Sequence, residues 1–289
     1  MQIERYEVAN GMIYLIDSEL GLNIQEPYSL PRLPGIGEKN GMSLDDFEVI
    51  WSRNEEGLLE GGYLKKAGYF HGQFLQFHPC GKVKGESFYK EGKLHGLSYF
   101  VSSKGVTLSV TWFYDGFPVG KAKQFYPSGN LYSLQQYNKG NLHGKQEYFY
   151  EDGSLKTSLN YKGGVLEGEV KLFWPSGQIK RQCVFSKGLR HGMDRIWGCD
   201  GVLLDEGEYV EGSPSGLHVR NYPNGLIKEK KIYRTPILFD HFIWDELGRP
   251  VYEGSYEEDL SFKEVTTLWP EGTCQIRKGT WNGSHICWE

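Results

Sequence analysis

The chain has 289 residues and a formal net charge of -5, and no apolar run approaches the roughly 18 residues of a transmembrane segment. The mild acidity disfavours a general nucleic-acid binder, which usually carries a basic excess. Aromatic residues reach 15% whereas apolar residues are only 39%, so burial should depend on Tyr, Phe and Trp. The five cysteines form no CxxC pair, which favours reduced thiols and a cytoplasmic location.

The N-terminal region is predicted to contain a hairpin and a linker, together residues 1–40. Apolar runs flank Asn10 and Gly11, and Asn-Gly between such runs favours a type I′ turn within residues 1–17. Residues 26–41 hold three prolines and three glycines, which is typical of a loop. The apolar run at the N-terminus is too short, and the segment is too acidic, for a secretory signal peptide. Export by another route remains an alternative.

The next region carries three series of glycines with a period of 24 residues. They run from Gly68 to Gly212, from Gly72 to Gly216 and from Gly81 to Gly225, and are called the first, second and third series. A fixed period of this length indicates a repeat array. We assign residues 41–233 to the array and residues 234–289 to degenerate C-terminal repeats that cap it, because terminal repeats are usually atypical.

Each repeat is expected to contain two short strands and two turns. The third-series glycine closes sequences such as "PSG", "EDG" and "PNG", in which Pro presets φ and Gly supplies a positive φ. Frequent glycines and the lack of a 3.6-residue period argue against helices. The sequence therefore predicts an all-β fold, an elongated single-layer antiparallel β-meander built from 24-residue β-hairpin repeats.

The apolar side chains fit this meander. The second residue after a third-series glycine is mostly apolar, and the eighth is aromatic in all seven units, as at Leu155 and Tyr161. Even offsets on a strand share a face, so both residues should belong to one packing ladder.

This frame resembles the MORN (membrane occupation and recognition nexus) repeat family in its bacterial variant form. One unit reads Tyr137, Gly140, Gly144, Phe149 and Gly153, which matches the family pattern of an aromatic, G-x-x-x-G, an aromatic and a turn glycine. The resemblance implies a MORN-type β-meander that acts as a protein-interaction or dimerisation module, without intrinsic catalysis. It also implies a contested phosphoinositide-binding role and, for many bacterial variants, an antitoxin-like label.

Two rows of repeated side chains are candidate binding residues. The first is an aromatic row on the partner strand, five residues after the second-series glycine, which could line an open groove that anchors a protein. It comprises Phe125, Phe149, Phe173 and Trp197. The second is a basic row for anionic lipid head groups, comprising Lys84, Lys156, Lys180, Arg181 and Lys228. Structural packing for the first row and plain solvation for the second are the alternative interpretations.

No pattern of residues indicates catalysis, a metal or a cofactor. Four histidines precede second-series glycines, but rungs about 10 Å apart cannot share one zinc, so a turn-stabilising role is favoured. They are His71, His95, His143 and His191. The G-x-S-x-G, HExxH and P-loop patterns do not occur. Another alternative is an enzyme within residues 234–289, where Asp240, His241 and Glu246 form a polar cluster.

The resulting functional hypothesis is a non-enzymatic repeat scaffold for protein–protein interaction, with self-association as one possibility. The alternatives are a peripheral binder of anionic, phosphoinositide-like lipid and an antitoxin-like or secreted effector module. The sequence does not name the partner.

Overall fold

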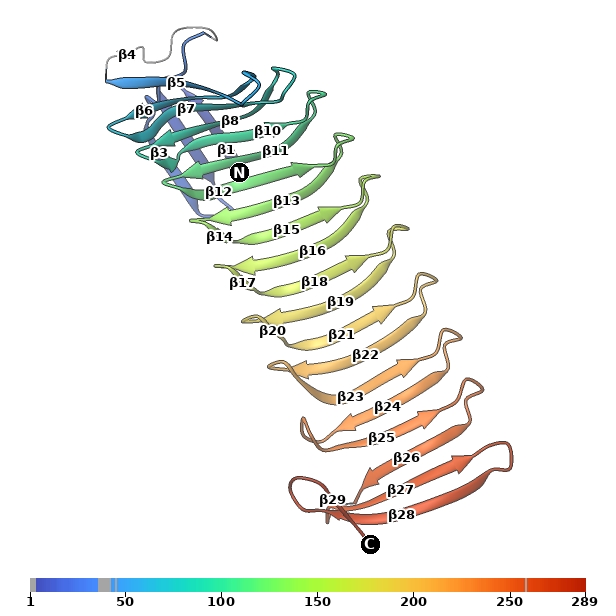
Figure 1. Cartoon of the computed structure of the whole chain (residues 1–289). Coiled ribbons are helices and arrows are strands. Elements are labelled where there is room, and N and C mark those ends of the chain that lie inside the picture. The colour runs from blue at the N-terminus through green and yellow to red at the C-terminus, as the bar shows by residue number, and fades with distance from the viewer. Residues whose placement is uncertain (1–3, 36–42, 45, 258) are drawn as a thin grey trace. The chain divides into compact units, whose positions relative to one another are not determined.

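The computed structural model describes residues 4–35, 43–44, 46–257 and 259–289, and that part of the chain contains strands and turns but no helix (Figure 1). Contacts divide the chain into two compact units, Met1–Val165 and Leu166–Glu289. In the part described, no helix is long and apolar enough to cross a membrane. The part of the predicted linker that follows Gly35 lies outside the described residues.

The first unit begins with a three-stranded antiparallel sheet of β1 (Glu4–Ala9), β2 (Met12–Asp17) and β3 (Leu22–Pro27). Asn10 and Gly11 have φ angles of 50° and 70°, so the predicted Asn-Gly hairpin is confirmed. Strand β3 was not predicted, because the sequence between Asp17 and Pro27 alternates only weakly between apolar and polar residues. It pairs with β2 along its whole length.

The rest of the first unit is an antiparallel meander in which each long strand pairs with the next long strand, and each two-residue strand pairs with a neighbouring long strand. Its strands are β4 (Ser43–Leu44), β5 (Phe47–Arg53), β6 (Leu59–Lys66), β7 (Tyr69–Phe77), β8 (Val83–Lys90), β9 (Lys93–Leu94), β10 (Gly96–Val101), β11 (Thr107–Tyr114), β12 (Phe117–Phe125), β13 (Leu131–Asn138), β14 (Asn141–Leu142), β15 (Gly144–Phe149) and β16 (Leu155–Lys162), with β17 (Val165–Leu166) at the division.

The second unit continues the same pattern of consecutive antiparallel hairpins. It comprises β18 (Gly168–Phe173), β19 (Ile179–Ser186), β20 (Leu189–Arg190), β21 (Gly192–Trp197), β22 (Leu203–Val210), β23 (Ser213–Asn221), β24 (Ile227–Tyr233), β25 (Phe239–Trp244), β26 (Pro250–Tyr256), β27 (Ser261–Leu268), β28 (Thr273–Trp281) and β29 (Ile286–Trp288). The predicted all-β antiparallel meander is therefore confirmed in both units. The boundaries at residues 40 and 233 stay predictions.

One repeat shows how the glycines produce this geometry. Gly140 and Gly153 have φ angles of 85° and 87°, which only glycine adopts at little cost. The Gly153 amide donates to the Tyr150 carbonyl at 3.0 Å and closes the "EDG" turn. A register shift between Tyr148 and Phe149 then marks a β-bulge next to that turn.

The main core of the first unit lies between the N-terminal sheet and the meander. Ile13 and Leu15 of β2 are fully buried, and they cluster with Leu20, Leu22 and Val119 of β12. Trp112 and Tyr114 pack against this cluster from β11 and are partly buried. A single sheet buries little by itself, so the added N-terminal layer supplies much of the apolar burial in this unit.

Candidate functional site

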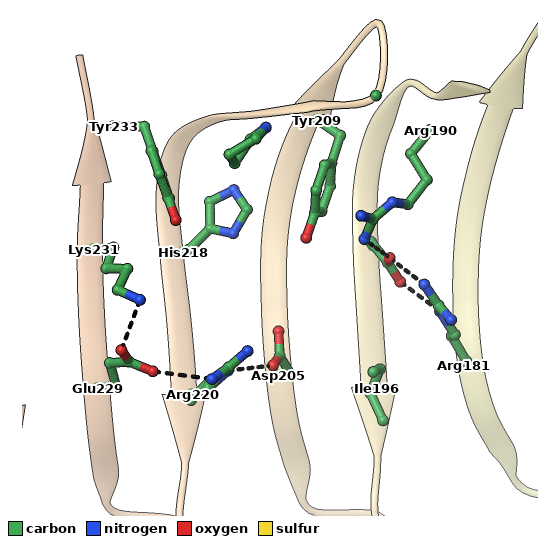
Figure 2. A pocket seen from close by; sticks show the side chains of 13 residues that line it. Arg181, Arg190, Ile196, Asp205, Tyr209, His218, Arg220, Glu229, Lys231 and Tyr233 are labelled. Carbon is green, nitrogen blue, oxygen red and sulfur yellow. Dashed lines mark hydrogen bonds and ion pairs between the residues drawn. The ribbon is translucent and has the colours of Figure 1, made fainter. Parts of the chain in front are cut away.

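A polar pocket of about 370 Å³ lies on the second unit over strands β19 to β24 (Figure 2). Direct cross-strand pairs place one row of side chains across its floor: Arg181, Ile196, Asp205, Arg220 and Glu229. Directly paired residues in an antiparallel sheet lie on the same face. The pocket is therefore a consequence of register, and four of the five residues in the row are charged.

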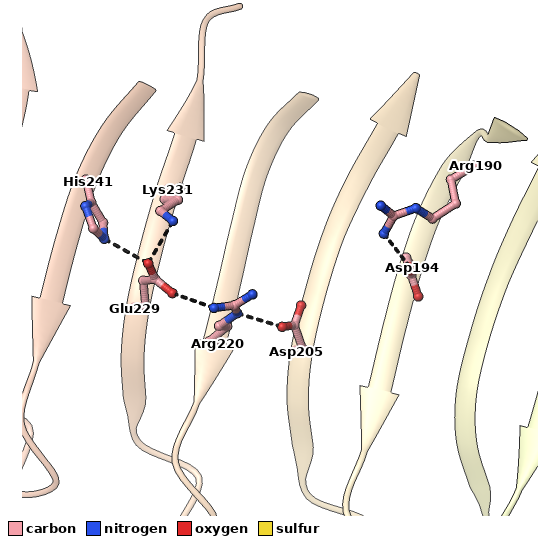
Figure 3. Close-up of polar contacts among 7 residues, drawn as sticks. All are labelled: Arg190, Asp194, Asp205, Arg220, Glu229, Lys231 and His241. Atoms are coloured by element: carbon pink, nitrogen blue, oxygen red, sulfur yellow. Dashed lines mark hydrogen bonds and ion pairs between the residues drawn. The ribbon is translucent and has the colours of Figure 1, made fainter. Parts of the chain in front are cut away.

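Arg220 is the centre of one ion-pair network. Its Nε donates to Asp205 Oδ2 at 2.8 Å, and its Nη1 donates to Glu229 Oε2 at 3.2 Å (Figure 3). Glu229 Oε1 also forms an ion pair with Lys231 Nζ at 2.9 Å, and it lies 2.9 Å from His241 Nε2. Burial alone would raise the pKa of Glu229, but these cations lower it overall. The carboxylate therefore stays ionised at neutral pH.

Asp194 is the centre of a second network beside the first. Arg181 binds it through two parallel hydrogen bonds, Nε to Oδ1 at 2.9 Å and Nη2 to Oδ2 at 2.6 Å. Arg190 adds a bond from Nη1 to Oδ2 at 3.2 Å. The hydrogen bond with Asp194 raises the pKa of Arg181, and burial raises the pKa of the neighbouring Cys183 thiol. The bidentate geometry fixes the guanidinium plane of Arg181 at the edge of the pocket, and the single bond holds Arg190 beside it.

An aromatic wall closes one side of the pocket. The rings of Tyr209 and His218 have centroids 5.1 Å apart, and those of His218 and Tyr233 are 4.8 Å apart, both edge to face. Arg190 Cζ lies 3.7 Å from the centroid of the Tyr209 ring, in cation–π geometry. His218 is held by its own contact of 2.7 Å between Nε2 and the Glu208 carbonyl oxygen.

The charged row departs from the rest of the repeat. Arg181, Asp205 and Glu229 each follow a third-series glycine by four residues, where the first unit has the small uncharged residues Gly85, Ser109, Ser133 and Thr157. The sequence interpretation missed this site because it searched for residues that recur. The signal that could have found it was the opposite one, a change from neutral to charged at a fixed repeat position.

The predicted aromatic row has a structural environment at strand ends. Phe125, Phe149, Phe173 and Trp197 are all half-buried, and each pairs with the apolar second residue after the next third-series glycine, at a β-bulge. None of them lines the polar pocket. Their role in partner binding stays a prediction.

The predicted basic row is divided by the structure. Three lysines lie over aromatic rings next to the turns: Lys156 over Tyr150, Lys180 over Trp174 and Lys228 over Tyr222, with Nζ 5.4, 4.4 and 5.5 Å from the ring centroids. Lys84 is exposed. Arg181 follows Lys180 directly on β19, so its side chain points to the opposite face and joins the pocket. Lipid binding by the row stays a prediction.

Three of the four repeated histidines contact turns, as predicted, and the role of His191 stays a prediction. His71, His95 and His143 each accept a hydrogen bond at Nδ1 from a backbone amide of the turn 20 residues later, at 3.3–3.4 Å. In the part of the chain that the structure describes, no group of three or more His, Cys, Asp or Glu side chains could hold a metal ion.

The predicted C-terminal polar cluster is divided among different partners. Asp240 pairs with Arg234 and accepts the Tyr256 amide, whereas His241 contacts Glu229. Each of these two polar side chains is thus held by its own structural contacts.

Comparison with known proteins identifies the repeat. The family model described as MORN repeat variant matches residues 70–101, 118–139, 142–162 and 166–187. A search of curated proteins gives no match.

Two solved structures align at very low similarity. One, titled "Crystal Structure of TcdB2-TccC3-TEV", is 11% identical with a TM-score of 0.18, and the alignment covers 82% of this chain but only 16% of that chain. The other, a porin-like protein from Bacteroides uniformis, is 10% identical with a TM-score of 0.17. That alignment covers 84% of this chain and 96% of the porin-like chain. These scores carry no structural argument.

Proposed function

Because the chain belongs to the MORN-repeat family, we propose that it is a non-enzymatic scaffold whose sheet surface binds another protein. Repeats of this family generally serve as protein-binding or membrane-binding modules and not as catalysts. A cytoplasmic location belongs to the same proposal, and the antitoxin-like and effector roles are specific forms of it.

The observation that supports this proposal is that the array already binds polypeptide, namely its own N-terminal segment. The backbone amide of Gln73 on β7 donates to the Pro31 carbonyl at 2.9 Å. The backbone amide of Leu33 donates to the side-chain oxygen of Gln73, Oε1, at 2.8 Å. Asn138 of β13 donates from Nδ2 to the Leu20 carbonyl at 2.9 Å. Backbone groups outside the meander are thus recognised by side chains and amides of the repeats.

The second-series glycines make room for this segment. At Gly120 the ring of Tyr6 occupies the space that a Cβ would fill, and at Gly96 the hydroxyl of Tyr28 does the same. The bound segment also presents carboxylates, since Glu26 accepts the Tyr114 hydroxyl at 2.8 Å. The repeat surface therefore suits polypeptides that carry aromatic and acidic side chains.

The test is cross-linking mass spectrometry on the full chain incubated with extract of its source cells. We expect cross-links from one recurring protein to residues on the strands of the array, and loss of that protein when unlabelled chain competes. Recovery of cross-links only within the chain and to lipid would contradict the proposal.

Lipid binding is the second candidate, favoured by the lysines that lie over turn aromatics. Such lysines keep their ammonium groups at the surface, where each could contribute about 1 kcal/mol near an anionic membrane. Co-sedimentation with phosphatidylserine vesicles should then decrease with salt and in Lys156→Glu and Lys180→Glu variants. Binding that is absent, or unaffected by salt, excludes it.

A further inference from the structure

We propose that the polar pocket of the second unit binds an extended acidic segment of the partner protein, through two carboxylates four residues apart. This inference deepens the proposed function and rests on it. It assigns the partner-binding site to strands β19–β24 and defines the chemistry of the partner. Three observations carry it: an excess of hydrogen-bond donors, a surplus of positive charge, and the spacing of the arginines.

The pocket has more donors than its own acceptors use. Arg220 pairs through Nε and Nη1, and its Nη2 group makes no hydrogen bond within the described residues. The side chain is 61% exposed, so this group is accessible to a ligand. Arg190 likewise commits only Nη1 to Asp194. The Tyr209 and Tyr233 hydroxyls line the same space and make no hydrogen bond to any described residue. A ligand that accepts hydrogen bonds satisfies all of these groups.

The charges have the same consequence. Four cationic side chains line the pocket (Arg181, Arg190, Arg220 and Lys231), against three carboxylates (Asp194, Asp205 and Glu229), so four minus three leaves one positive charge. Every one of these carboxylates already holds at least one cation. An anionic ligand is therefore complementary, and a carboxylate can accept two bonds from one guanidinium.

The spacing of the two arginines suits a peptide. Arg190 is anchored on Asp194 of β21, and Arg220 lies on β23, two strands further and two residues further along the strand direction. With strands about 4.8 Å apart and a rise of about 3.4 Å per residue, the backbone positions of Asp194 and Arg220 are separated by about 12 Å. Residues i and i+4 of an extended chain are separated by about 13 Å and point to the same side. A segment of the form acidic-x-x-x-acidic therefore reaches both arginines.

The chain supplies its own precedent for this recognition. In the first unit, Glu26 approaches Lys90 at 3.5 Å and His95 at 3.4 Å while Tyr28, two residues later, stacks on His95. An acidic residue two positions before an aromatic one is thus bound by a lysine and by rings of the repeats. In the second unit, Tyr209, His218 and Tyr233 offer the corresponding ring wall beside Arg190 and Arg220.

The experiment measures binding of the acetylated, amidated peptide Gly-Glu-Ala-Tyr-Ala-Glu-Gly to the full chain by isothermal titration calorimetry. Two control peptides have Gln at both acidic positions, or both Glu residues adjacent. Inorganic phosphate and free glutamate are titrated separately. We expect the first peptide to bind at least tenfold more tightly than either control peptide or either small anion, and more weakly at high salt.

Three variants locate the site. Arg220→Gln should weaken binding at least tenfold, and Tyr233→Phe, which keeps the ring but removes a hydroxyl, several-fold. The matched control is Arg195→Gln. Arg195 pairs with Glu206, is 41% exposed and lies on the opposite face of β21, so binding should not change. Circular dichroism and thermal melting establish that each variant is folded.

Three results would overturn the inference. The first is no preference for the spaced acidic peptide, and the second is equal loss in the Arg220 and Arg195 variants. The third is phosphate binding as tightly as the peptide with the same dependence on Arg220, which would make the pocket a general oxyanion site. If the inference fails but partner cross-links map elsewhere on the array, the proposed scaffold function stands. If no partner is cross-linked at all, the proposed function itself fails.

Discussion

Gly120 allows a direct test of how the N-terminal sheet is attached to the array. Gly120 has a φ angle of 69°, and a Cβ at this position would overlap Cε1 and Cζ of the Tyr6 ring. A Gly120→Ala substitution therefore imposes two separate costs, backbone strain and displacement of Tyr6. Tyr6 donates its hydroxyl to Asp17 at 2.7 Å, so displacement also breaks a hydrogen bond to a buried carboxylate.

The two costs can be estimated and separated. An L-residue in the left-handed region costs about 1 kcal/mol relative to glycine, and loss of a hydrogen bond to a charged group costs about 1.5 to 3 kcal/mol. Gly216 occupies the equivalent repeat position with a φ angle of 62°, and a Cβ there would meet only the flexible end of Glu208, at 3.2 Å. Gly216→Ala should thus cost about 1 kcal/mol, and Gly120→Ala about 3 kcal/mol.

The assay is amide hydrogen exchange at β2 (Met12–Asp17), combined with urea denaturation. The additional cost of about 2 kcal/mol in Gly120→Ala should increase opening of β2 about 30-fold, whereas Gly216→Ala should leave β2 exchange unchanged. Adding Tyr6→Ala to Gly120→Ala should cost less than the sum of the two single substitutions, because the overlap disappears. Equal effects of the two glycine substitutions, or full additivity with Tyr6→Ala, would refute the close-approach argument.

Three further predictions concern burial, pH and the pocket. Leu15→Ala should lower the free energy of unfolding by about 2 to 5 kcal/mol in urea titrations, because Leu15 is fully buried. Burial and the neighbouring Lys90 lower the pKa of His95 despite Glu26 nearby, so the unfolded chain binds this proton more tightly. Stability should therefore be complete above pH about 6.5 and decrease below it, and His95→Gln should make the urea midpoint less dependent on pH. Asp194→Asn should cost about 1 to 3 kcal/mol, since two partly exposed arginines lose their shared carboxylate, and a thermal melt that is unchanged would contradict this.

The glycine pattern was sufficient to predict the fold of the array. A glycine such as Gly153 is required where φ is 87°, and the spacing of such positions fixes strand length and direction at the same time. The turn contacts of His95 and His143 agree with the role that was favoured once their spacing had excluded a shared zinc ion. Local turn chemistry was therefore enough for the repeated turns and strands.

The packing of the N-terminal sheet could not be obtained in this way. Ile13, Leu15 and Asp17 are the buried residues of β2, and the alternation is visible in the sequence. Their partners Trp112 and Val119 occupy positions that are buried or exposed according to whether a second layer covers the repeat. Contacts between segments about 100 residues apart follow from tertiary packing, and no local period encodes them.

The charged row of the second unit shows where a regular array can carry specificity. Opposite charges paired across strands, such as Asp205 and Arg220, contribute about 0.2 to 1 kcal/mol each, so stability alone could account for the pairs. The surplus cation and the two tyrosine hydroxyls that bond to no described residue add no such pair, so their donors are available to a ligand. If the row serves only the fold, replacing Arg220 by Gln and Asp205 by Ser, the residues of the equivalent pair Gln124 and Ser109 in the first unit, should leave partner cross-links intact. If the row recognises the partner, the same exchange should preserve the melting temperature within a few degrees and abolish those cross-links.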